Sequence, residues 1–134
     1  MYIQRQRKDL CRMHAINNYY QREVLTEKIF YKYCDEFDKK YNVLHSNIFS
    51  YFIDGDCLIS FILRKISGIK TKIVYGSEIK KYNFKDVFVF NHSHIWVCKK
   101  INNIWYNFDS LSGISKIQNP NQGFGFIFVE TGFS

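Results

Sequence analysis

The sequence predicts an α+β fold, with helices in the first half of the chain and strands in the second. Up to about residue 67, apolar side chains recur at intervals of three and four, which is the spacing of amphipathic helices. From about residue 70, they alternate along short runs, which is the period of a half-buried strand. Helices that precede the strands, and do not alternate with them, are typical of α+β folds.

Length and composition indicate one domain, residues 1–134. Hydrophobic residues make up 46% of the chain and aromatic residues 19%, which is enough to form a core and excludes a disordered chain. No apolar run approaches the ~20 residues that a membrane helix needs, so we expect no membrane partner. The first residues contain no apolar segment of a secretory signal. We therefore expect a monomer in the cytoplasm and the nucleus.

Charge and cysteine content narrow the function classes. The net charge of +7 is spread along the chain without a nucleic-acid reader motif, so we expect no nucleic-acid partner. The four cysteines form no C-x-x-C pair, so we expect no zinc site and no other cofactor. Without a signal peptide, we expect reduced thiols. Abundant Ile, Lys, Asn, Tyr and Phe are typical of an AT-rich genome, such as that of a large DNA virus or a parasite, whose protein would act inside the host cell.

The first expected helix carries a cysteine at its start. Asp9 is a good N-cap residue, because its carboxylate can accept a hydrogen bond from a first-turn N–H group. Cys11 would then lie in the first turn, where the helix dipole favours a thiolate. A single cysteine at such a position is more often a small buried core residue. Cys11 therefore becomes a candidate nucleophile only if other residues support it.

Two further helices follow before the strands. The second is expected at Lys28 to Phe37, after Thr26, and the third from about Asp56 to Ser67. Gly68 is well suited to end the third helix. Cys57 would fall in the first turn of the third helix, and we interpret it as structural because no histidine follows at a useful spacing.

Five strands are expected in the second half of the chain. They are Lys70 to Tyr75, Val87 to Asn91, His94 to Lys99, Ile104 to Ser110, and Phe124 to Glu130. Asn102 and Asn103 form a two-residue turn between the third and fourth strands, because asparagine tolerates positive φ angles.

This hairpin brings a histidine and a carboxylate together. With the turn at Asn102 and Asn103, Cys98 faces Asn107, and His94 becomes the diagonal neighbour of Asp109 on the same face. A cysteine nucleophile needs a histidine base and a third group that orients it, so we assign these roles to His94 and Asp109. A turn one residue longer would change the pairing. The residues alone leave open a surface histidine and a strand-end carboxylate with no joint role.

The segment around Cys11 has a further pattern. Gln6 lies five residues before the cysteine, His14 three after it, and Asn17 and Asn18 six and seven after it. These spacings resemble the nucleophile motif of the Josephin-domain deubiquitinases, the family that includes ataxin-3 and the small Josephin proteins. The segments from His94 to Val97 and from Trp105 to Leu111 resemble the histidine and acid strands of the same family.

The resemblance implies a role for each matching residue. Cys11 matches the nucleophile, His94 the general base and later acid, and Asp109 the residue that orients the histidine. Gln6 matches the side chain that helps to form the oxyanion hole, with the backbone N–H of Cys11 as the second donor. His14 matches a family position to which we assign no catalytic role.

The resemblance also implies a papain-like cysteine protease fold, with N-terminal helices packed on an antiparallel sheet. The chain departs from the family pattern in two ways. Ile95 follows the histidine where the family usually has an aromatic residue. The segment between Asn18 and Asp54 is short, so we expect a shortened form of the helical arm that contributes to ubiquitin binding in ataxin-3.

The expected function is that of a cysteine-dependent deubiquitinase that hydrolyses isopeptide bonds at the ubiquitin C-terminus through a thioester intermediate. Its partner would be ubiquitin or polyubiquitin. Two alternatives stay open. One is a papain-like peptidase that acts on another ubiquitin-like modifier or on a double-glycine peptide. The other is a catalytically weak module that binds ubiquitin.

Overall fold

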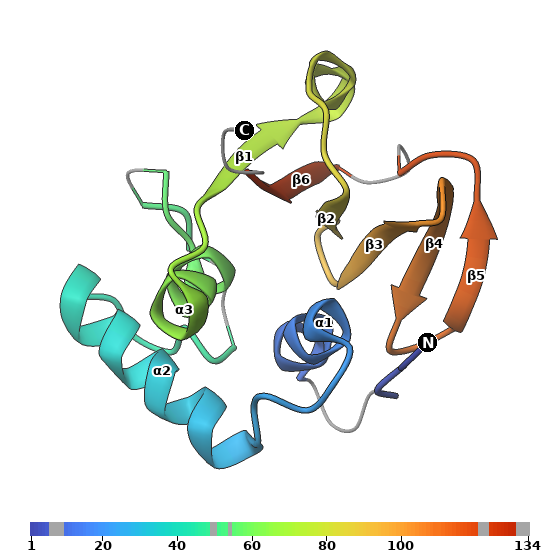
Figure 1. Ribbon diagram of the computed structural model, residues 1–134. Helices are drawn as coiled ribbons and strands as arrows, with labels where there is room; N and C mark the ends of the chain where they lie inside the picture. Colours follow the sequence, from blue (N-terminus) through green and yellow to red (C-terminus); the bar gives the residue numbers. More distant parts are fainter. Residues whose placement is uncertain (6–9, 49–50, 54, 121–123, 131–134) are drawn as a thin grey trace.

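The computed structural model describes residues 1–5, 10–48, 51–53, 55–120 and 124–130. Within these ranges the chain forms three α-helices and an open six-stranded antiparallel sheet (Figure 1). The predicted α+β class is therefore confirmed. No helix within the described ranges has the length and apolar character needed to cross a membrane.

The first two helices lie where the sequence predicts them. Helix α1 spans Cys11–Tyr20 and α2 spans Glu27–Tyr41, so α2 ends four residues later than predicted. The predicted cap of α1, Asp9, lies outside the described residues, and the N-cap position itself is taken by Leu10, which has no side-chain cap. Thr26 caps α2, because its Oγ1 accepts a hydrogen bond from the backbone N–H of Ile29 at 3.3 Å.

The third helix, α3, spans Leu58–Ser67, so it begins two residues later than predicted. Cys57 is the N-cap residue in extended conformation, and its predicted place in the first turn was wrong. Asp56 stays outside the helix because it pairs with Ile53 in an isolated β-bridge. Gly68 ends α3 with a φ of 65°, a left-handed conformation that glycine adopts without steric cost, as predicted.

The six strands form one sheet in the order β1-β6-β2-β3-β4-β5. Their bounds are Thr71–Tyr75 (β1), Asp86–Phe90 (β2), Ile95–Ile101 (β3), Ile104–Asp109 (β4), Gly113–Ile117 (β5) and Gly125–Val129 (β6), with a 3₁₀ helix, η1, at Gly76–Lys81. The sequence patterns did not predict β5 or η1. Strand β5 lies at the sheet edge with four of its five residues partly or fully exposed, so its apolar alternation is weak.

The register of the β3–β4 hairpin agrees with the prediction. Cys98 pairs with Asn107, and Val97 pairs with Phe108. The two turn residues, Asn102 and Asn103, have φ angles of 52° and 66°, as a two-residue hairpin turn requires.

The main core lies between the helices and one face of the sheet. In Figure 1, α1 lies between the pair formed by α2 and α3 and the strands β3 to β5. Phe88, Val97 and Phe108 of the sheet are fully buried in this core together with Ile16 of α1. A smaller cluster covers the opposite face of the sheet and contains Cys98 and Phe126. The contact of α1 with β3 brings the start of the helix close to the start of the strand.

Candidate active site

Cys11 is the first residue of α1, and its side chain is partly exposed. The first bond within the helix is donated by the N–H of His14 to the carbonyl oxygen of Leu10, at 3.0 Å. The N–H groups of the residues before His14 have no acceptor within the helix, as at every helix N-terminus. They give the surroundings of the sulfur a partial positive charge, which favours a thiolate.

His94 lies directly before β3 and is bound to the end of β4. Its Nε2 atom is 2.7 Å from Oδ1 of Asp109, the last residue of β4. The same carboxylate oxygen accepts the backbone N–H of Leu111 at 2.9 Å. Nε2 is hydrogen-bonded to the carboxylate. The other ring nitrogen, Nδ1, is therefore the one available to hydrogen-bond the thiol of Cys11.

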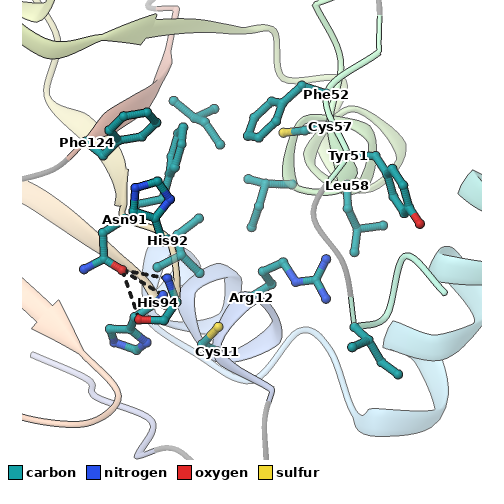
Figure 2. Close-up of a pocket in the computed structure, with 16 residues that line it drawn as sticks. Cys11, Arg12, Tyr51, Phe52, Cys57, Leu58, Asn91, His92, His94 and Phe124 are labelled. Atoms are coloured by element: carbon teal, nitrogen blue, oxygen red, sulfur yellow. Dashed lines mark hydrogen bonds between the residues drawn. The ribbon is translucent and has the colours of Figure 1, made fainter.

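A turn formed by Asn91 fixes the backbone of His94. The Oδ1 atom of Asn91 accepts the backbone N–H of Ser93 at 3.0 Å and that of His94 at 2.9 Å (Figure 2). Such a side-chain acceptor holds the chain in a tight turn before β3 begins. The imidazole is therefore oriented from two sides, by the carboxylate at its ring and by the amide at its backbone.

The charges around Cys11 favour its ionised form. Burial by itself raises the pKa of the Cys11 thiol, but a hydrogen bond and the charge of His94 act in the opposite direction. The charge of Arg12 and the backbone N–H of Ile95 add to this effect, and the pKa of Cys11 lies below its ordinary value. The lowered pKa increases the fraction of thiolate, which is the nucleophilic form of the side chain.

The partners of Cys11 show the complementary shifts. The hydrogen bond that His94 donates to Asp109 and the contact with Cys11 raise the pKa of His94 to about 9, although burial opposes this. Burial raises the pKa of Asp109, but the hydrogen bonds from His94 and Leu111 outweigh it and the pKa is lowered. The three shifts together favour a thiolate at Cys11, an imidazolium at His94 and a carboxylate at Asp109.

A cavity of about 560 Å³ opens beside Cys11 and His94. Figure 2 shows Cys11, Arg12 and His94 at one end of it, with Phe52, Cys57 and Leu58 on the α3 side and His92 and Phe124 on the strand side. The lining is mostly apolar and aromatic, and Arg12 and His94 are polar groups at the cysteine end. Such a cavity fits an extended apolar chain whose reactive carbonyl reaches the sulfur.

The wall formed by β2 and β6 depends on a glycine. A Cβ atom at Gly125 would overlap the ring of Phe90, which no real packing allows. The ring of Phe90 also stacks on Phe52 at a centroid distance of 5.4 Å. The absence of a side chain at Gly125 thus lets Phe90 lie across the strand and line the cavity.

Comparison with known proteins adds no family assignment. No model of a known protein family matches this chain, and no curated protein sequence matches it. The case for the site therefore rests on its geometry and on the motif spacing.

The structure brings together three of the four residues expected in the site. Cys11, His94 and Asp109 come from α1, the start of β3 and the end of β4, and their side chains form one connected chain of contacts. The fourth, Gln6, lies outside the described residues. Within the described ranges, no group of three or more histidine, cysteine, aspartate or glutamate side chains is placed to hold a metal ion.

Three other residues that could act in such a site make different contacts. Asn107 binds Cys98, whose Sγ donates to Asn107 Oδ1 at 2.8 Å, so Asn107 does not orient His94. His92 lies at the cavity rim with its ring 4.9 Å from that of Phe124. Cys34 is buried, and burial raises its pKa to about 12, so it is a core residue.

His14 is fully buried and does not line the cavity. Its Nδ1 atom is 2.6 Å from Oε1 of Gln4, which also accepts Nδ2 of Asn17 at 2.7 Å. Asn18 Oδ1 accepts the backbone N–H of Gln4 at 2.6 Å. The polar residues that follow Cys11 in the motif therefore bind the N-terminal segment to α1.

Sequence patterns missed two residues beside the nucleophile and its base. Asn91 could have been found, because an asparagine two or three residues before another residue commonly accepts its backbone N–H. The sequence patterns assigned no role to Arg12. Its burial depends on the packing of α1 against the loop before α3, which no local pattern reveals.

Proposed function

We propose that this chain is a cysteine-dependent deubiquitinase that hydrolyses isopeptide bonds at the C-terminus of ubiquitin. The proposal is supported most by the 2.7 Å contact of His94 with Asp109 next to Cys11. A nucleophile, a base and an orienting group in this order form the arrangement that cysteine peptidases require. The choice of ubiquitin as substrate comes from the resemblance of the Cys11 and His94 segments to Josephin domains.

The reaction would proceed in two steps. The Cys11 thiolate attacks the carbonyl carbon of the C-terminal glycine of ubiquitin, and His94 gives its proton to the departing lysine amine. This forms a thioester and releases the substrate lysine. His94 then takes a proton from water, which attacks the thioester. This releases the carboxylic acid of ubiquitin, which ionises in solution, and restores the Cys11 thiolate and the charged His94. Asp109 keeps the ring in position throughout and stabilises its charged form.

The oxyanion of the tetrahedral intermediate would be stabilised by the Cys11 backbone N–H and by Gln6. The N-terminal position of Cys11 in α1 supports the first donor, because its N–H has no acceptor within the helix. The second donor is assigned from the resemblance alone. Replacement of Gln6 by alanine should then lower kcat by about 100-fold, the usual cost of one oxyanion donor.

We further propose that the fold is a papain-like one with a reduced helical arm. The packing of α1, which carries the nucleophile, on the sheet that carries the histidine supports this. Between α1 and α3, the described residues contain a single helix, α2, of 15 residues. Ubiquitin would then be bound largely through its extended C-terminal tail in the apolar cavity beside Cys11.

The proposal is tested with ubiquitin that carries an electrophile in place of its C-terminal carboxylate. We expect covalent labelling of the wild-type chain and none of the Cys11→Ala variant. Cys34→Ala serves as the matched control, because it removes a thiol that is buried away from the cavity. Labelling that persists in Cys11→Ala would exclude Cys11 as the nucleophile.

The same assay separates the alternative functions. Probes built on other ubiquitin-like modifiers, and a double-glycine peptide substrate, are compared with ubiquitin under the same conditions. If one of these reacts faster than the ubiquitin probe, the substrate is that modifier or peptide and not ubiquitin. Ubiquitin binding without labelling in the wild type would mean that the chain is a binding module.

A further inference from the structure

Arg12 lies next to the nucleophile and is buried, which is unusual for an arginine. Its side chain is only 8% exposed and lines the same cavity as Cys11 (Figure 2). Its Nη1 atom donates a hydrogen bond of 2.5 Å to the backbone carbonyl oxygen of Ser46. A buried guanidinium needs such acceptors, because its transfer from water is costly.

Ser46, whose carbonyl oxygen accepts this hydrogen bond, is itself fixed by two hydrogen bonds to α2. Ser46 is fully buried, and its hydroxyl donates to the carbonyl oxygen of Cys34 in α2 at 3.1 Å. Its backbone N–H donates to Oδ1 of Asp38, also in α2, at 3.3 Å. The guanidinium of Arg12 is therefore fixed between α1 and the loop after α2, and it cannot turn out to solvent without breaking a buried contact.

Three thiols among the described residues interact with the charge of this guanidinium. They are those of Cys11, Cys34 and Cys57, from α1, α2 and the N-cap of α3. Burial raises the pKa of both Cys34 and Cys57, so these two thiols stay neutral at physiological pH. Among the described residues, His94 and Arg12 are the charged groups that act on Cys11.

We propose that Arg12 is a positioning residue of this site, whose guanidinium, anchored on Ser46, keeps Cys11 in the thiolate form. His94 and Arg12 would share this task from two sides. His94 loses its charge when it transfers its proton, whereas an arginine stays charged at every relevant pH. Arg12 would thus keep the sulfur ionised before the substrate arrives. The role of Cys11 as nucleophile rests on the proposed function, but its ionisation does not.

The experiment measures the ionisation of Cys11 without any ubiquitin. The rate of Cys11 alkylation by iodoacetamide is followed by mass spectrometry across a pH series in wild type, Arg12→Gln, Arg12→Met and Arg12→Lys. Arg22→Met is the matched control, because it removes one charge from an exposed position just beyond the other end of α1. Circular dichroism identifies the folded variants.

We expect the inflexion of the alkylation profile to move upward by about one pH unit in Arg12→Gln and Arg12→Met, which is the worth of a unit charge at close range. Arg12→Lys should restore most of this shift, because it returns a cation to the same place. Arg22→Met should leave the profile unchanged. A folded Arg12→Gln or Arg12→Met variant is sufficient to test whether the charge of Arg12 lowers the pKa of Cys11.

An unchanged inflexion in a folded neutral variant would overturn the proposal. A shift in Arg12→Lys as large as in Arg12→Gln would also overturn it, because the cause would then be packing and not charge. If wild type fails to react with the ubiquitin probe but the alkylation shift is observed, the deubiquitinase proposal fails and the role of Arg12 stands.

Discussion

His94 Nε2 lies 2.7 Å from Asp109 Oδ1, and this contact spans the open end of the β3–β4 hairpin. Asp109 ends β4, while His94 precedes the first residue of β3, so the two side chains meet diagonally across the strand pair. The remaining nitrogen of the ring is directed to the thiol at the start of α1. One hairpin thus orients the base, and one helix presents the nucleophile.

The carboxylate of Asp109 should matter far more for activity than the amide of Asn107. We expect Asp109→Ala to lower kcat/KM by about 100-fold or more, because the imidazole loses its orientation and its charge partner. Asn107→Ala should change kcat/KM little, because its amide contacts the Cys98 thiol. Steady-state cleavage of a fluorogenic ubiquitin substrate provides the measurement. A larger loss for Asn107→Ala would contradict the assigned roles.

The pH dependence of kcat/KM should be bell-shaped. The pKa of Cys11 is lowered and that of His94 is raised to about 9, so the thiolate and the imidazolium coexist at pH values above the lowered pKa of Cys11 and below about 9. Activity should fall on the acid side as Cys11 gains a proton, and on the basic side as His94 loses one near pH 9. In Asp109→Asn, the basic limb should move to lower pH, because the group that accepts the hydrogen bond from His94 loses its negative charge. A basic limb that does not move would contradict this.

The turn made by Asn91 should control the position of His94 without stabilising the core. We expect Asn91→Ala to lower kcat/KM by about tenfold to 100-fold, because the backbone N–H of His94 loses its acceptor and the ring shifts. Asn91→Asp keeps the acceptor and should retain most of the activity. Because Asn91 is exposed, the thermal unfolding of both variants should stay close to that of the wild type. Equal loss in the two variants would mean that the acceptor is not what matters.

The cavity wall should not accept a side chain at Gly125. We expect Gly125→Ala to destabilise the fold by about 1–3 kcal/mol, because the new methyl group overlaps the ring of Phe90. The double variant Gly125→Ala with Phe90→Leu should recover part of this loss, because the smaller side chain leaves room. Urea unfolding of the two single variants and the double variant measures the coupling. Strictly additive effects would mean that the clash with Phe90 is not the cause.

The amide of Asn17 should contribute mainly to stability. Its Oδ1 accepts the backbone N–H groups of Val24 and Leu25 at 2.9 and 2.8 Å, and its Nδ2 donates to Gln4. We expect Asn17→Ala to cost about 2–4 kcal/mol, because these buried groups lose their partners. Asn119→Ala, at an exposed position, is the control and should stay within about 0.5 kcal/mol of the wild type. Urea unfolding measures both, and a small effect of Asn17→Ala would contradict the role.

Much of the candidate site could be predicted because its determinants are local. The turn at Asn102 and Asn103 sets the hairpin register, and the register places His94 beside Asp109. Thr26 and Gly68 mark helix ends by side-chain capping and by a left-handed conformation. In each case a few neighbouring residues determine the backbone, so a pattern in the sequence is sufficient.

Other features depended on contacts between distant segments. Strand β6 lies between β1 and β2, which come about 35 to 60 residues earlier in the chain, and no sequence period encodes such an insertion. The edge strand β5 pairs only with β4 and has little apolar alternation of its own. The start of α3 at Leu58 reflects the bridge between Ile53 and Asp56.

The sequence by itself determined the α+β order of elements, the β3–β4 hairpin and the pairing of His94 with Asp109. Only the tertiary structure decided that α1 packs on β3, so that Cys11 meets His94, and that Arg12 is buried against Ser46. The physical reason is the distance along the sequence over which each interaction acts. Turns, caps and strand registers follow from the stereochemistry of adjacent residues, whereas the place of a helix on a sheet follows from the burial of the whole apolar face.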